Sequence, residues 1–351
     1  METCRLFHEA AIPSFYEFLY WPDMTGFSRQ CHLIWDDVSV DHRSRRWPRS
    51  LEMGSKSRLH AWKTMGERDT ISFRLTLPAI ATFTNLSSVT ISHAFFPLNE
   101  ICSFVSLLPL LVSLTLRNVH RDWSRNIVAS ASPTASLESL REITFLDLGG
   151  CNPFELDSGF VAVSRLVSLP GLRKLCVSMD TFLDIICALP EVDATFSPTL
   201  SSLRVHTVLC EDVDAKLLNT PRIAQLIRRA LTSCAPVLRD LHIYTSHSIN
   251  RTDAILTLPN LVEYIGPHEF LCGLRFASSL KTLWVPASPH KQSTLWRMST
   301  AFVDDVSSFN IQSLRVLRFS VSDTPFESLF FTFRGLKQVG LELATPVSKA
   351  R

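Results

Sequence analysis

This 351-residue sequence has little charge, little glycine and no long apolar run. Charged residues make up 19% of the chain and hydrophobic residues 46%, a balance that excludes a largely disordered protein. Only 11 residues are glycine, and they form no G-x-G-x-x-G, P-loop or G-x-S-x-G motif. No stretch of about 18 consecutive apolar residues is present, so we expect no membrane-spanning helix.

The nine cysteines show no C-x-x-C spacing. An odd number without paired spacing indicates reduced, mostly buried thiols, as in a cytosolic or nuclear protein. His206 and Cys210, four residues apart, are a weak candidate pair for a metal, because a structural zinc usually needs four ligands. With no catalytic motif in view, we expect no enzymatic activity, no cofactor and no metal.

An apolar pattern, L-x-x-L-x-L, recurs ten times along the chain. Its copies begin at residues 86, 111, 143, 172, 200, 238, 261, 280, 314 and 336. Residues two apart on a strand face the same side, so the L-x-L half of each copy predicts a short strand with two core side chains. Copies stacked side by side predict a parallel ladder with a continuous apolar interior.

Parallel strands need long crossovers, and four intervening segments have helical periodicity. These segments are residues 99–108, 158–169, 180–189 and 221–231. The expected fold is therefore α/β: a curved parallel β-ladder with helices on its convex side. An ordinary open α/β sheet is the alternative.

The third copy, ITFLDLGGCN at residues 143–152, is the most specific. Cys151 follows its last strand leucine by three residues, which resembles the cysteine-containing leucine-rich repeats of many F-box proteins. The other nine copies lack Cys or Asn at that place. The resemblance to fungal F-box/leucine-rich-repeat proteins implies a leucine-rich-repeat solenoid of about ten irregular repeats over residues 71–351.

Residues 3–20, TCRLFHEAAIPSFYEFLY, resemble the closing helix of an F-box. Leu19 falls near the place of the leucine that ends this run in the family. The earlier part of an F-box is missing, so we expect a truncated or degenerate F-box, or simply a helical cap for the solenoid. The resemblance implies that the residues docking on the cullin-adaptor protein are Cys4, Phe7, Ala11 and Ile12.

Residues 1–70 form a separate N-terminal region that ends in a basic, Trp-rich stretch. Residues 42–68 contain eight Lys/Arg and two Glu. This stretch is interpreted as a linker; a nuclear-localisation signal and a binding patch are alternatives. Nucleic acid is a less favoured partner because no nucleic-acid-binding module surrounds it.

In a leucine-rich-repeat solenoid the x positions of the pattern face the concave side. From the fourth copy onward basic residues outnumber acidic ones at these positions, which suits an acidic or phosphorylated protein segment, with Trp284 and Tyr244 as aromatic anchors. The candidate partner-binding residues are Arg173, Lys174, Arg204, Arg239, His242, Tyr244, Lys281, Trp284, Arg315, Arg318 and Lys337.

The resemblance implies a non-catalytic subunit that recognises protein substrates for a cullin-type ubiquitin ligase, in the cytoplasm or nucleus. A leucine-rich-repeat interaction scaffold without a ubiquitin role is the first alternative. An α/β enzyme whose site the sequence does not reveal is a more distant one.

Overall fold

The computed structural model shows an α/β protein whose described strand pairs are all parallel. Contacts divide the chain into two compact units, Met1–Ser197 and Pro198–Arg351. The structure describes residues 14, 17–21, 46–54, 80–95, 98–120, 137–148, 158–206, 221–244, 256–266, 274–276, 279–285, 311–319 and 335–343.

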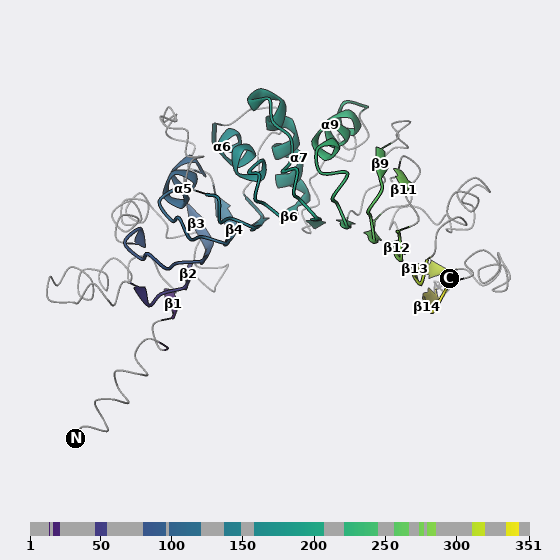
Figure 1. The fold of residues 1–351 in the computed structure, drawn as a ribbon, viewed down its shortest axis with the longest axis horizontal. Coiled ribbons are helices and arrows are strands. Elements are labelled where there is room, and N and C mark those ends of the chain that lie inside the picture. Colours follow the sequence, from purple (N-terminus) through teal and green to yellow (C-terminus); the bar gives the residue numbers. More distant parts are fainter. Residues whose placement is uncertain are drawn as a thin grey trace, which may run out of the picture. The chain divides into compact units, whose positions relative to one another are not determined.

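In the N-terminal unit, each strand is hydrogen-bonded to the next one along the chain (Figure 1). The strands are β1 (Phe18–Trp21), β2 (Ser50–Gly54), β3 (Ser88–Phe95), β4 (Ser113–His120), β5 (Glu142–Leu146) and β6 (Lys174–Ser178). The described residues of this unit also form helices α5 (Leu98–Val105), α6 (Ser158–Val167) and α7 (Met179–Ala188) and the 3-10 helix η3 (Leu189–Val192). These three α-helices lie on one side of the strands (Figure 1), and each belongs to a crossover between parallel strands.

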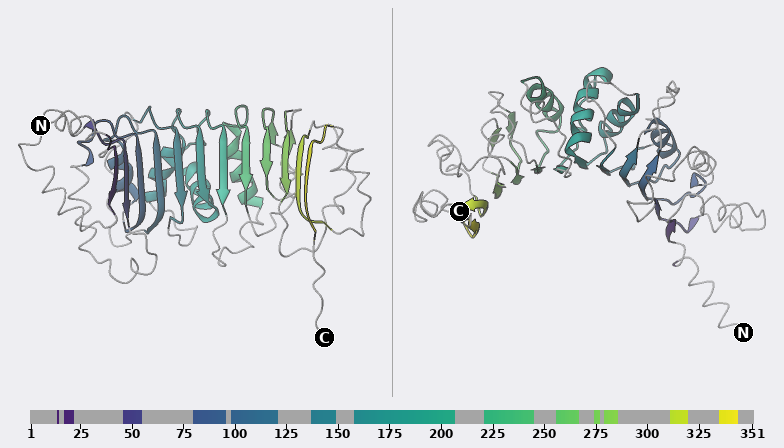
Figure 2. Two further views of the ribbon diagram at one scale, coloured as in Figure 1. Left: turned by 90° about the horizontal axis from the view of Figure 1, so that it is seen from below. Right: turned by 180° about the vertical axis from the view of Figure 1, so that it is seen from behind.

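The C-terminal unit repeats this plan (Figure 2). Its sheet runs in the order β7 (Ser202–His206), β8 (Asp240–Ile243), β10 (Glu263–Ile265), β12 (Thr282–Val285), β13 (Ser313–Phe319) and β14 (Gln338–Leu343). Helix α9 (Pro221–Thr232) and a small parallel pair, β9 (Leu256–Leu258) with β11 (Leu274–Phe276), lie on one side of it (Figure 1).

Apolar triads of the strands form part of the core, together with buried apolar residues of the helices. In β4 the triad is Leu111, Leu114 and Leu116, each at most 1% exposed. The register aligns Leu114 with Val89 of β3 and with Ile143 of β5, so equivalent residues form continuous buried rows across the strands. All ten predicted copies contain a described strand, and the parallel arrangement predicted for them is confirmed.

The register of the third copy differs from the prediction by three residues. Its triad is Leu140, Ile143 and Phe145, because Ile143 aligns with Leu114 and Leu140 is fully buried. Leu148, not Cys151, therefore follows the last triad residue by three positions. Leucines three apart match the pattern in two frames, and only pairing with the neighbouring strand selects one of them.

The ninth copy is shifted in the same way. Leu283 of β12 aligns with Leu314, and Ile311 is fully buried, so the triad begins at Ile311 and not at Leu314. Arg315 keeps an x position, aligned with Trp284. Arg318 does not, because it falls where the register between β13 and β14 shifts.

Two strands, β1 and β2, lie within the region interpreted as an F-box remnant and linker. Leu19 aligns with Leu51, and Leu51 with Val89, so both strands extend the same ladder. The prediction of a closing helix at Leu19 and of a linker at Ser50–Gly54 is therefore wrong for these residues. The pattern does not predict β2, because Pro48 and Met53 stand at two of the three positions where it expects Leu, Ile or Val.

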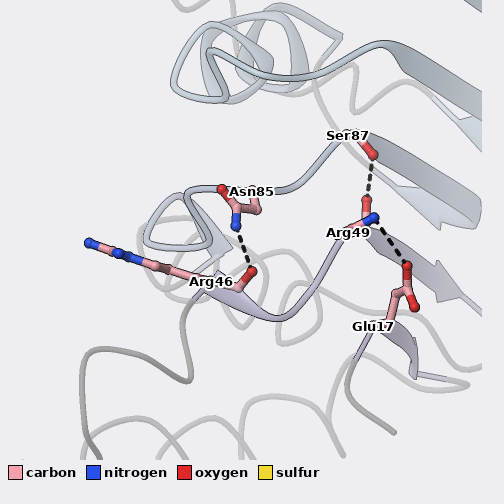
Figure 3. Close-up of polar contacts among 5 residues, drawn as sticks. All are labelled: Glu17, Arg46, Arg49, Asn85 and Ser87. Carbon is pink, nitrogen blue, oxygen red and sulfur yellow. Dashed lines mark hydrogen bonds and ion pairs between the residues drawn. The ribbon is translucent and has the colours of Figure 1, made fainter. Parts of the chain in front are cut away.

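Polar contacts outside the core join these first strands (Figure 3). The Ser87 hydroxyl donates to the Arg49 carbonyl at 3.0 Å, and the Asn85 amide donates to the Arg46 carbonyl at 2.8 Å. The Arg49 guanidinium lies 3.6 Å from the Glu17 carboxylate. These contacts join the residues that directly precede β1, β2 and β3, and so they support the pairing of the three strands.

One copy replaces the third apolar residue by glycine. Tyr264 of β10 is fully buried, and a Cβ on Gly266 would lie 2.5 Å from the Tyr264 hydroxyl oxygen. The Tyr264 ring reaches toward the place of the third triad residue, so a side chain at position 266 would have to displace the ring.

Candidate binding site

Side chains on the uncovered face of the C-terminal sheet form the candidate site. In Figure 2, no described helix or strand of this unit lies over the sheet face opposite α9. Side chains alternate between the two faces of a strand, so the residues between core positions point away from the helix side. They include Arg204 of β7, His242 of β8 and Trp284 of β12.

Four rings meet at the ends of these strands and form what we call the aromatic cluster: His206, His242, Tyr244 and Trp284. His206 and Tyr244 stack at a centroid distance of 5.1 Å, with their planes 10° apart. Tyr244 meets His242 edge to face at 6.2 Å and Trp284 edge to face at 6.0 Å. These are the favourable geometries for aromatic pairs.

The backbone places Tyr244 at the centre of the cluster. It directly follows β8, and its N–H donates to the Val205 carbonyl at 2.7 Å, which continues the ladder one residue beyond the strand. His242 precedes Tyr244 by two residues and therefore lies on the same face. The structure thus brings together three of the candidate partner-binding residues, His242, Tyr244 and Trp284, and adds His206, which the sequence suggested only as a weak candidate metal ligand.

Both imidazoles are biased toward the neutral form. Burial lowers the pKa of His206, and the charges of Arg204 and His242 lower it further. Burial also lowers the pKa of His242, although Glu263 opposes the shift from 3.5 Å, between Nε2 and Oε2. The cluster is therefore an uncharged aromatic surface beside one exposed cation, Arg204.

This arrangement suits a ligand with two kinds of group. The ring faces and edges of Tyr244 and Trp284, both half-buried, can contact an apolar or aromatic side chain. The exposed Arg204 guanidinium can pair with a carboxylate or phosphate, in bidentate fashion where the geometry allows. Burial raises the pKa of Tyr244, so its hydroxyl stays protonated at neutral pH.

Not every predicted site residue is accessible. His242 is only 5% exposed, covered within the cluster, so it supports the site rather than contacting a partner. Arg239, Lys281 and Lys337 are exposed. Arg315 lies beside Trp284 in the register, while Arg318 lies at the register shift.

Arg173 and Lys174 belong to the other unit, where they flank the start of β6, and both are exposed. Lys174 pairs with Glu142 at 2.6 Å. The corrected register adds Arg141 to the same face, but its guanidinium donates to the carbonyls of Glu138 and Gly171. Lys174 and Arg141 are thus engaged by groups within the protein.

Asp147 lies just beyond the end of β5 in the left-handed conformation, with φ of 53°. Its N–H donates to the Ser178 hydroxyl at 3.2 Å. The predicted adaptor-docking residues Cys4, Phe7, Ala11 and Ile12 lie outside the described residues, as do Cys151 and Cys210.

The described part of the chain offers no metal site, since no three His, Cys, Asp or Glu residues in it are placed to hold an ion. The four described cysteines, at 102, 176, 187 and 234, are free, and burial raises the pKa of Cys102 and Cys234 to about 12. None of the described helices is long and apolar enough to cross a membrane.

Comparison with known proteins adds no identity: no family model matches the sequence, and no curated protein is significantly similar to it. The geometry of the site is therefore the basis for assigning a function.

Proposed function

We propose that this chain is a non-catalytic protein-binding protein, built as a leucine-rich-repeat solenoid. The observation that supports this proposal is the parallel ladder, which buries its triads on the helix side and leaves its opposite face uncovered by any described element. Each short strand presents one or two side chains there, so stacked repeats make a broad surface suited to another protein.

A more specific proposal is substrate recognition for a cullin-type ubiquitin ligase, in the cytoplasm or nucleus. It rests on the F-box resemblance of residues 3–20. The scaffold alternative gains support from β1, because Leu19 aligns with Leu51 in the ladder instead of closing an F-box helix.

Site-specific photo-crosslinking tests the binding role. A crosslinking amino acid replaces Gln312, on the uncovered face, or Arg228, exposed on α9, in the full chain expressed in its native host. We expect a defined protein adduct from position 312 and none from position 228. The same adducts from both positions, or none from either, would contradict a partner-binding face.

Co-expression with the cullin adaptor separates the two forms of the proposal. A stoichiometric complex that is lost on Phe7→Asp supports the ligase role. A protein adduct at position 312 without any adaptor complex supports the scaffold.

A further inference from the structure

A row of backbone hydrogen bonds crosses the C-terminal sheet just before the first residues of its strands. The N–H of Arg239 donates to Ser201, that of Val262 to Arg239, that of Lys281 to Val262, that of Gln312 to Lys281 and that of Lys337 to Gln312. Each donor–acceptor distance is 2.7 or 2.8 Å. The row fixes which residues stand side by side on successive strands.

Alternate members of this row are basic. Arg239, Lys281 and Lys337, which we call the basic row, are all exposed, and the intervening Val262 and Gln312 are half-buried and uncharged. Neighbouring strands lie about 4.8 Å apart, so consecutive cations stand roughly 9.6 Å apart. An extended polypeptide in the polyproline II conformation has three residues per turn and rises about 9.3 Å per turn, so every third side chain lies on the same side at an interval that matches this one.

These cations are unbalanced within the described residues. None of Arg239, Lys281 and Lys337 forms an ion pair with a described residue, whereas Arg49 and Lys174 on the N-terminal sheet each pair with a glutamate. Two acids, Asp240 and Glu263, lie one position further along the strands. Against the three cations they leave a net positive charge, to which the exposed Arg204 adds.

We propose that the basic row binds an extended acidic segment of a partner protein, with acidic residues at every third position. The inference rests on the proposed function and names the chemistry of its partner. The segment runs across the strands, and each carboxylate meets one cation of the row. Charge complementarity favours a polyanion, and the three-residue interval favours an extended polypeptide.

Synthetic peptides test the interval. Three fluorescent peptides of identical composition, each with three Asp among Ser and Gly, have the acids spaced by two, three or four residues. Fluorescence anisotropy with the full chain at low salt measures each Kd. We expect the three-residue spacing to bind about tenfold more tightly than the others, because only it pairs all three charges.

A matched pair of charge reversals tests the location. Lys281→Glu replaces the central cation of the row, and Arg228→Glu makes the same change of charge on the helix side of the same unit. Lys281→Glu should weaken binding of the three-spaced peptide at least tenfold, and Arg228→Glu less than twofold. Thermal melting of both variants confirms that they fold.

Equal affinities for the three peptides, or equal effects of the two reversals, would overturn the inference. So would a single-stranded oligonucleotide that binds more tightly and is equally sensitive to Lys281→Glu. If these results occur and position 312 still forms a protein adduct, only the inference about the basic row fails and the proposed function stands. If position 312 forms no adduct, both the inference and the proposed function fail.

Discussion

Tyr244 has a histidine on two sides, and each contact depends on the protonation state of the imidazole. His206 stacks on the phenol ring, and His242 meets it edge to face. A neutral imidazole avoids the repulsion from Arg204 that a charged one would meet, and burial favours the neutral form further. The packing of the aromatic cluster should therefore become less favourable when the imidazoles are protonated.

We expect the protein to lose stability as the pH falls from 7.5 to 5.5. Both pKa values lie below the ordinary 6.5 in the folded state, so the unfolded chain takes up more protons in this range. The stabilisation is complete above pH 6.5 and is lost as the pH falls through the folded-state values. Thermal melting at several pH values measures it.

The control is the double variant His206→Gln, His242→Gln. Its melting temperature should fall less steeply over the same pH range, whatever its value at pH 7.5. If the melting temperature of the variant changed with pH as steeply as that of the unmodified chain, the pKa values of these two imidazoles would not be lowered in the folded state.

At the scale of the single strand, register is what the sequence leaves open. Leu137, Leu140 and Ile143 are spaced by three, as are Leu140, Ile143 and Leu146, so the L-x-x-L pattern fits more than one frame. The structure buries Leu140 completely and leaves Leu146 half-buried.

Alanine substitution distinguishes the two frames. Leu140→Ala should lower the free energy of unfolding by about 2–5 kcal/mol, the usual cost of a cavity in a packed core. Leu146→Ala should cost about 1 kcal/mol or less. Urea denaturation measures both; the reverse order would support the frame that begins at Ile143.

Elements with strong periodicity were predictable, and the rest depended on tertiary pairing. Helix α9, expected at residues 221–231, begins at the Pro221 that signals a helix start. Strands β1 and β2 were not predicted, because Trp21 and Met53 stand where the pattern expects Leu, Ile or Val. Of the site, the sequence predicted Tyr244 and Trp284 from position alone. The burial of His242 was not predictable, because it depends on rings from neighbouring strands.

At the scale of the whole molecule, the two units have the same arrangement of parallel strands but differ in the charges on their sheets. On the N-terminal sheet, Lys174 pairs with Glu142 and Arg49 with Glu17. On the C-terminal sheet, the basic row and Arg204 leave positive charge for a partner. Such binding should weaken as salt rises, because exposed charges are screened. These surfaces exist only if the strands are parallel and in the observed register.

Disulfide trapping between β12 and β13 tests that arrangement most directly. Cysteines at aligned positions of parallel strands lie about 4.8 Å apart at Cα, within disulfide range, and a two-residue offset places them roughly 8 Å apart, beyond it. Thr282 aligns with Ser313, and Trp284 with Arg315.

The double variants T282C/S313C and W284C/R315C should both form the new disulfide under mild oxidation, as identified by peptide mass spectrometry. The crossed variants T282C/R315C and W284C/S313C should not. Disulfides in the crossed pairs, with none in the aligned pairs, would mean antiparallel strands and would contradict the ladder.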